Sequence, residues 1–228
     1  MAKIIVLNNS TDQMETYFLD ENDPMPYNVG GTLRVREFRG SSASPTLWTN
    51  SATMEAWNRT RARFGRGIPV GYAFKRPWEG GHSSQSQHYA GVAFDVGQNA
   101  FGWTNAMRAS LRSLAISSGL WRFVEPVSMS PTWVHFDRRQ LPPACRVGYP
   151  TLRQGSRSTY VLVLQDGLNT LGFRTGGLDG NFGPATRTAV MDFQRRYGLG
   201  VDGVVGCITW TNLANRVVGR GRTSTTID

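Results

Sequence analysis

Residues 86–95 have the sequence SQHYAGVAFD, and the rest of the chain can be understood as the support of this stretch. Its histidine, His88, and its aspartate, Asp95, are joined by small and apolar residues. This pattern predicts a loop that carries His88 and a buried strand that carries Asp95. A third side chain of the same kind, His135, lies in the extended pattern of residues 132–137. Together the three side chains provide two imidazoles and one carboxylate.

This donor set is typical of catalytic zinc, which takes three protein ligands and leaves the fourth position to water. In an extended strand Ala93 and Asp95 share one face while Phe94 faces the core, so the carboxylate would be held rigidly. Ser86 is placed to hydrogen-bond beside the site and to orient a ligand. The competing interpretation is a capped loop histidine and a strand aspartate in an ion pair, and the spacing of His88 and Asp95 does not decide between them.

Length and composition limit the classes of protein. The 228 residues, 39% of them hydrophobic, can form one large domain or two unequal ones. No run approaches the roughly 20 apolar residues of a membrane span, so no membrane partner is expected. Residues 1–9 are too short an apolar stretch for a signal peptide, which predicts synthesis in the cytoplasm without one.

Charge and cysteine content are less specific. The formal net charge of +9 is spread over both halves of the chain without a recognisable nucleic-acid-reading motif, so nucleic acid is not expected as a partner. An anionic cell wall fits a diffuse basic charge equally well. Cys145 and Cys207 form no C-x-x-C pair and lie far apart, which predicts two free thiols.

The first two thirds of the chain mix strands and helices without strict alternation. Short apolar or alternating runs predict strands at residues 3–8, 15–19, 32–38, 68–74, 121–127 and 132–137, the last two as a hairpin. Helical spacing of apolar residues predicts helices at residues 51–64 and 105–118, each followed by glycine. Residues 75–87 form a long loop, which is usually functional or disordered. This order favours an α+β fold with a small antiparallel sheet and flanking helices.

The C-terminal part contains an internal repeat. The pattern D-G-x-x-G-x-x-T begins at Asp179 and recurs 23 residues later at Asp202. Each copy predicts a turn that starts a helix. Three amphipathic patterns, one before the repeat and one after each copy, predict a small all-α three-helix domain. The predicted parts are residues 1–31 as an N-terminal extension or edge hairpin, 32–140 as the catalytic domain, 141–153 as a linker, 154–216 as the helical domain and 217–228 as a flexible tail.

The pattern S-x-H-x-x-G-x-A-x-D at residues 86–95 resembles a motif of the zinc D-alanyl-D-alanine peptidases and phage endolysin peptidases, which share a fold with hedgehog proteins. Residues 133–135 resemble their W-x-H segment. The resemblance covers about residues 32–140 and implies this hedgehog/DD-peptidase-like fold. It also implies zinc bound by His88, Asp95 and His135, and hydrolysis of a peptide bond in peptidoglycan stem peptides or cross-links.

Such a mechanism needs a carboxylate that takes the proton of the zinc-bound water. Many members of the family carry an acidic residue three positions before the last histidine, where this chain has Thr132. We favour Glu125, in the preceding strand of the predicted hairpin, as this base. Asp137 shares the strand face of His135 and is either the base or a partner that orients the histidine. For both residues the alternative is an ordinary structural carboxylate.

The substrate side of the resemblance departs from the family at one position. Family members commonly carry an arginine after the tyrosine of the strand before the loop, but Ala73 follows Tyr72 here. Lys75 or Arg76 can take over the binding of a substrate carboxylate. The further candidates for substrate binding are Tyr72, Ser86 and Trp133. His82 is a candidate fourth ligand in a resting state or a polar wall of the cleft.

The C-terminal repeat is similar to the three-helix peptidoglycan-binding domains over about residues 154–215. The two resemblances support each other, because a binding domain raises the local concentration of a hydrolase at its polymer. Together they imply a monomeric zinc peptidoglycan peptidase. Such a protein would be an endolysin or autolysin that acts on the cell wall after release. The alternative is a non-catalytic peptidoglycan-binding protein with a structural metal site. The bond that would be cleaved stays open.

Overall fold

The computed structural model describes residues 1–98 and 102–228. Their contacts divide the chain into two compact units. Unit 1 consists of Met1–Phe74 and Gly91–Arg139, and unit 2 consists of Lys75–Ala90 and Gln140–Asp228. The long loop at residues 75–90 therefore belongs with the C-terminal part of the chain, although its place in the sequence predicts it within the catalytic domain.

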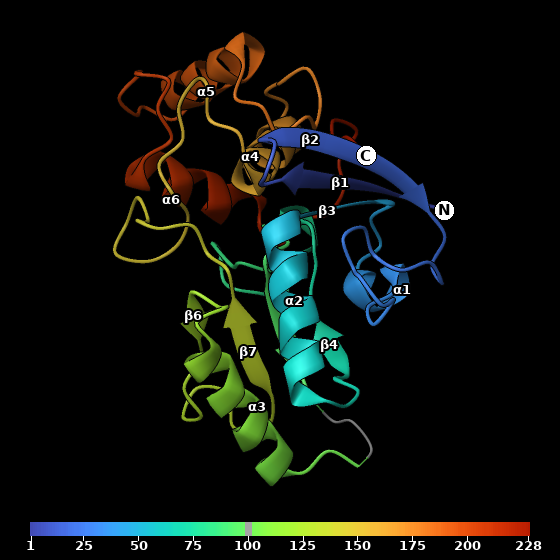
Figure 1. Ribbon diagram of the computed structural model, residues 1–228. Helices are drawn as coiled ribbons and strands as arrows, with labels where there is room; N and C mark the ends of the chain where they lie inside the picture. The colour runs from blue at the N-terminus through green and yellow to red at the C-terminus, as the bar shows by residue number, and fades with distance from the viewer. Residues whose placement is uncertain (99–101) are drawn as a thin grey trace. The chain divides into compact units, whose positions relative to one another are not determined.

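The main sheet of unit 1 is antiparallel, as predicted. In the described residues its strands follow the order β4 (Val70–Tyr72), β5 (Ala93–Val96), β7 (Val134–Asp137) and β6 (Phe123–Val124). Helices α2 (Ser51–Phe64) and α3 (Asn105–Ser118) lie side by side over one face of it (Figure 1). On that face the ring of Trp57 stacks on Phe94 at 4.7 Å between centroids. Because the apolar rings fill this face, polar side chains of the same strands lie on the other.

A second sheet of unit 1 is built on the N-terminal segment. Strand β1 (Ala2–Asn8) lies between β2 (Gln13–Leu19), which is antiparallel to it, and β3 (Thr46–Asn50), which is parallel. The two predicted strands of residues 1–31 are confirmed. Strand β3 was not predicted, because its adjacent residues Leu47 and Trp48 are both buried and leave no alternating pattern.

The predicted strand at residues 32–38 is wrong. The chain instead forms helix α1 (Val35–Arg39). Its apolar residues Val35 and Phe38 are three positions apart and both fully buried, which is helical spacing. The backbone N–H of Arg34 donates to the carboxylate of Glu37 at 2.7 Å and stabilises the first turn.

Unit 2, all of whose residues are described, confirms the three predicted helices. They are α4 (Thr159–Thr170), α5 (Pro184–Arg196) and α6 (Cys207–Val217). Throughout the described residues of both units, every helix is too short or too polar to span a membrane. The architecture of the chain is therefore α+β in unit 1 and largely helical in unit 2.

The repeated loops of unit 2 each enclose a buried glutamine. The amide oxygen of Gln165 accepts the backbone N–H of Gly180 at 2.9 Å, and its nitrogen donates to Asp179 Oδ1 at 2.6 Å. Gln194 makes the same two bonds, to Gly203 at 2.9 Å and to Asp202 at 2.9 Å. The Asp-Gly pair recurs because each copy must present one carboxylate and one free N–H to a buried amide.

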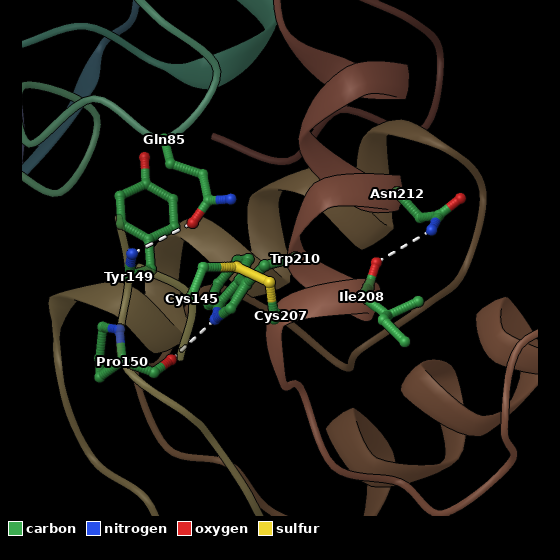
Figure 2. Close-up of a disulfide and its surroundings, with 8 residues drawn as sticks. All are labelled: Gln85, Cys145, Tyr149, Pro150, Cys207, Ile208, Trp210 and Asn212. Atoms are coloured by element: carbon green, nitrogen blue, oxygen red, sulfur yellow. Dashed lines mark hydrogen bonds between the residues drawn. A yellow bond between two sulfur atoms is a disulfide. The ribbon is translucent and has the colours of Figure 1, made fainter. Parts of the chain in front are cut away.

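The prediction of free thiols is wrong, because Cys145 and Cys207 form a disulfide (Figure 2). Cys207 begins α6, and the segment 141–153, predicted as a linker, folds onto this helix. We call this segment the strap. The indole N–H of Trp210 donates to the carbonyl oxygen of Pro150 in the strap at 2.7 Å. The cysteines are 62 residues apart, so only the tertiary fold reveals that they meet.

Residues 217–228, for which the composition predicts a flexible tail, are bonded to the rest of unit 2. The N–H of Gly221 donates to the carbonyl oxygen of Trp78 at 2.8 Å, and the hydroxyl of Thr223 donates to the carbonyl oxygen of Thr170 at 3.1 Å. The first of these bonds reaches the 3-10 helix η1 (Pro77–Glu79). The tail thus joins the loop at residues 75–90, which we call the inserted loop, to α4.

Candidate active site

Polar side chains form a row across the polar face of the antiparallel sheet in unit 1. Asp95 and His135 are direct partners between β5 and β7, and Tyr72 of β4 is the partner of Asp95. Directly opposed residues of an antiparallel pair place their side chains on the same face. The backbone N–H of Glu125, one residue after β6, donates to the carbonyl oxygen of His135 at 2.9 Å. Three predicted site residues therefore come from three neighbouring strands, and a fourth, Glu125, directly follows the next strand, β6.

The ring of His135 lies between two carboxylates. Its Nδ1 is 2.7 Å from Asp95 Oδ1, and its Nε2 is 3.2 Å from Asp137 Oδ2. Burial lowers the pKa of His135, but the hydrogen bonds to Asp137 and Asp95 outweigh it and raise the pKa to about 9 in the absence of a metal. Both ring nitrogens are thus oriented by acceptors, so the plane of the imidazole is well defined.

Asp137 is a fully buried carboxylate with donors on both oxygens. Its Oδ1 accepts the Nε–H of Arg139 at 2.8 Å and the backbone N–H of the same residue at 3.0 Å. Burial raises the pKa of Asp137, while Arg139 and His135 lower it by more, so it lies below its usual value. Sequence reasoning missed Arg139; the available signal was its position two residues after Asp137, on the same face of an extended chain.

The turn before His135 is held by Arg112 of α3. This mostly buried guanidinium donates to the carbonyl oxygens of Glu125 at 3.0 Å, Ser130 at 2.7 Å and Trp133 at 2.7 Å. One side chain therefore fixes both ends of the segment that carries two predicted site residues, Glu125 and the half-buried Trp133. Arg112 was not predicted, because the sequence of its helix does not reveal that its side chain contacts the turn before His135.

The glycine of the motif, Gly91, is required by close packing. It has a φ of +67°, and a Cβ built on it would lie 1.9 Å from the carbonyl oxygen of Trp48 in β3. Its own carbonyl oxygen accepts the hydroxyl of Thr49 at 2.7 Å. Strand β3 therefore passes directly against the residue from which the chain enters β5.

Replacing Gly91 by alanine is expected to destabilise unit 1 by about 2–4 kcal/mol, because the new methyl group meets a backbone oxygen that cannot move without shifting β3. Chemical denaturation measures this change. Gly119 is a matched control: its φ is +64°, but nothing lies within 4 Å of a built Cβ. Its replacement by alanine costs only the conformational penalty of about 1–2 kcal/mol. Equal losses for the two variants would contradict the close contact.

In unit 2 the inserted loop holds two histidines together. The rings of His82 and His88 stack at 4.4 Å between centroids with 22° between their planes. His88 is 2% exposed, and its backbone N–H donates to the hydroxyl of Ser86 at 3.3 Å. The hydroxyl of Tyr89 donates to the carbonyl oxygen of His82 at 3.2 Å. The loop therefore presents two adjacent imidazoles in a defined arrangement.

Two tyrosines tether this loop within unit 2. The hydroxyl of Tyr149 donates to the carbonyl oxygen of Ser86 at 2.8 Å, and the hydroxyl of Tyr160 donates to Gln87 Oε1 at 2.7 Å. The partners are 63 and 73 residues apart in the sequence. No local pattern could have indicated either tyrosine as part of the support of the site.

Arg76, a predicted candidate for substrate binding, lies inside unit 2. Its side chain is fully buried, and its Nε–H donates to Asp166 Oδ2 at 2.9 Å, with a second bond of 2.5 Å to Oδ1. Asp166 of α4 is fully buried as well. Lys75, which is only partly buried, is the remaining cation of the predicted pair.

The structure thus brings predicted site residues together in two groups. Unit 1 joins Asp95, His135 and Asp137, with Tyr72 in the neighbouring strand β4 and Glu125 directly after β6. Unit 2 joins His82 and His88 with the hydroxyl of Ser86.

Comparison with known proteins identifies a class for the C-terminal part. Residues 157–213 match the family described as "Putative peptidoglycan binding domain". This match agrees with the similarity deduced from the repeat, and it covers α4, α5 and most of α6. The C-terminal part of the chain is therefore similar to this family.

Particular relatives match over limited segments. The chain is 49% identical over 53 residues to N-acetylmuramoyl-L-alanine amidase CwlM of Mycobacterium tuberculosis, which is 23% of this chain and 13% of that protein. It is 38% identical over 73 residues to Zinc D-Ala-D-Ala carboxypeptidase of Streptomyces albus G, 30% of this chain and 28% of that protein. Among solved structures, the SleB N-terminal domain is 37% identical, with a TM-score of 0.29 over 29% of this chain and 92% of that one. The chain spans less than a third of either curated relative.

Proposed function

We propose that the protein is a zinc-dependent peptidoglycan peptidase that cleaves an amide bond of stem peptides or cross-links. The observation that carries this proposal is the pair of Asp95 Oδ1 and His135 Nδ1, 2.7 Å apart, with a buried carboxylate on the other ring nitrogen. The similarity to Zinc D-Ala-D-Ala carboxypeptidase supports the reaction class. The peptidoglycan-binding domain supports the polymer as substrate, and with the disulfide it supports action at the cell wall.

The residues fit zinc by the chemistry of their donors. Imidazole nitrogen and carboxylate oxygen are its usual ligands besides cysteine, and a metal-binding histidine commonly donates its second ring N–H to a carboxylate. Asp137 is bonded to His135 in this way. We therefore assign His88, Asp95 and His135 as the ligands, and His82 adds a further imidazole to the donor set as the candidate fourth ligand.

When bound, zinc supplies a Lewis acid that polarises the scissile carbonyl and acidifies the attacking water. Glu125, whose backbone N–H is bonded to the carbonyl oxygen of His135, takes the proton of this water and passes it to the leaving amine nitrogen. Asp137 keeps the ring of His135 oriented and does not exchange protons with the substrate, because both of its oxygens are engaged. Lys75 binds a carboxylate of the peptide.

The remaining assignments are supporting roles. Tyr72 lies next to Asp95 in the row of polar side chains and contacts the substrate peptide. Trp133, which is half-buried two residues before His135, provides an apolar wall. Ser86 orders the backbone of the histidine loop by accepting the N–H of His88.

Purified sacculi test the proposal. We expect the protein to release new amino termini from sacculi, to lose this activity with a zinc chelator and to regain it with added zinc. His88→Ala is expected to abolish release while binding to sacculi persists, because the variant leaves the three-helix domain intact. Mass spectrometry of the fragments identifies the bond that is cleaved.

Two outcomes would contradict the proposal. Release that is insensitive to both the chelator and His88→Ala would exclude a zinc peptidase. Binding of the wild-type protein to sacculi without release, in the presence of zinc, would instead indicate a non-catalytic peptidoglycan-binding protein with a structural metal site.

A further inference from the structure

The strap connects the disulfide of unit 2 to the loop that carries the histidines. Cys145 is bonded to Cys207 at the start of α6, and Tyr149 follows four residues later in the strap. In Figure 2 a dashed line joins the backbone N–H of Tyr149 to Gln85 Oε1, to which it donates at 3.1 Å. Its hydroxyl donates to the carbonyl oxygen of Ser86 at 2.8 Å. A single strap residue thus binds two consecutive residues of the loop.

The fit between the strap and the loop is close. The amide nitrogen of Gln87 donates to the carbonyl oxygen of Gly148 at 3.3 Å. A Cβ built on Gly148, where φ is +111°, would lie 2.3 Å from Gln85 Oε1. The ring of Tyr149 is buried and packs against Trp210 of α6 at 5.0 Å between centroids. The strap therefore holds the three residues that precede His88.

The disulfide limits the freedom of the strap. Residues 140–157 contain no helix or extended strand. Leu152 and Val205 exchange backbone hydrogen bonds of 3.2 and 2.8 Å, but the part of the strap before Leu152 is joined to α6 by the disulfide and by side-chain contacts. Ordering such a segment costs conformational entropy, and a cross-link removes part of that cost. When the bond is absent, the strap samples more conformations, and the bonds from Tyr149 and Gly148 to the loop are made for less of the time.

We propose that formation of the Cys145–Cys207 disulfide positions the histidine loop for zinc, with Tyr149 as the positioning residue. The proposal rests on the proposed function in assigning His88 as a ligand. It makes the metal site of this protein sensitive to the redox state of its surroundings. The oxidised protein binds zinc tightly, and the reduced protein binds it weakly.

The bond forms by thiol–disulfide exchange with a small disulfide such as oxidised glutathione. The thiolate of Cys145 attacks one sulfur of that disulfide and releases one thiol. The thiolate of Cys207 then attacks the mixed disulfide at Cys145 and releases the second thiol. The two protein thiols lose two electrons and two protons in total, and the external disulfide is reduced to two thiols.

Hydrogen exchange without metal tests the positioning directly. We expect amides of residues 85–90 to exchange faster in the double variant Cys145→Ser, Cys207→Ser than in the oxidised wild-type protein, while the turn around Asp179 keeps its protection. Equal exchange at residues 85–90 in the two proteins would overturn the proposal, and this result does not depend on zinc binding.

Metal affinity tests the consequence. We expect the double serine variant and Tyr149→Ala to bind zinc at least about tenfold more weakly than the oxidised wild-type protein. Removing a residue that orients a metal ligand usually has an effect of this size. The absorption spectrum of bound Co²⁺ should change in both variants. Tyr149→Phe, which keeps the ring and loses only the bond to Ser86, should recover part of the affinity.

Gln165→Ala is the matched control, because the bonds of this buried amide reach only the repeat loop of residues 179–186. It should lower the stability of unit 2 without changing zinc affinity, measured where the protein is folded. If Gln165→Ala weakened zinc binding as much as Tyr149→Ala does, the loss of affinity would follow from lower stability alone. This result would overturn the positioning role of Tyr149. The proposed function fails if the oxidised wild-type protein binds no zinc, or if the His88→Ala variant binds zinc as tightly as the wild-type protein does. In either case hydrogen exchange still decides whether the disulfide positions the loop.

Discussion

Glu125→Gln is expected to lower the turnover number for release of peptidoglycan fragments by about 10²–10⁴-fold, the usual contribution of a general base. Glutamine keeps the size and the backbone bond to His135 but cannot take a proton from water. Zinc content should stay equal to that of the wild-type protein, since Glu125 is not a proposed ligand. The measurement combines the rate of release of new termini from sacculi with the zinc-to-protein ratio.

Two further variants separate the role of Glu125 from general effects of charge. Glu55→Gln removes an exposed carboxylate of α2 that forms a surface ion pair of 3.6 Å with Arg59, and it should leave turnover unchanged. Asp137→Asn should instead weaken zinc binding by about 10–100-fold, because it alters the acceptor that orients His135. If Asp137→Asn abolished turnover with zinc bound and Glu125→Gln did not, the two carboxylates would have the opposite roles.

Arg76→Met is expected to destabilise unit 2 by about 3–5 kcal/mol, because it leaves the buried carboxylate of Asp166 without its partner. The guanidinium is fully buried and also lies 3.4 Å from a carboxylate oxygen of Asp228. Loss of Arg76 therefore also loosens the contact between the inserted loop and the tail. Urea unfolding followed by tryptophan fluorescence, to which the buried Trp210 of unit 2 contributes, measures the change in free energy.

The double variant Arg76→Met, Asp166→Leu should recover most of this loss, since apolar residues of similar volume often replace a buried ion pair without destabilisation. Arg222→Met is the surface control. Arg222 is exposed and pairs with Asp228, and its replacement should cost less than about 1 kcal/mol. A cost for Arg76→Met as small as that of Arg222→Met would show that the buried pair does not hold the loop.

The sequence by itself determined the elements whose signals are local. Helices α2 and α3 end directly before Gly65 and Gly119, both in the left-handed conformation, as the apolar spacing and the following glycines predict. The helices of the repeat follow in the same way from their turns. These features depend on residues within a few positions of one another, so hydrogen bonding and side-chain periodicity along the chain suffice to predict them.

The sequence also named the residues of the candidate site but could not describe their surroundings. His135 and Asp95 were candidates from the motifs, yet their contact depends on the register of β5 and β7. Asp137 was left as base or orienting partner, and its burial with Arg139 favours the second role. Helix α1 was missed because an alternating pattern and a helical one overlap over so few residues.

Only the tertiary structure decided what depends on distant residues. Arg76 looks like any loop cation until Asp166, 90 residues later, buries its charge. Cys145 and Cys207 look unrelated until the strap folds onto α6. The loop with His88 looks autonomous until the strap and α4 tether it to unit 2. In each case the free energy comes from burial and hydrogen bonding between segments far apart in the chain, which no local pattern of residues encodes.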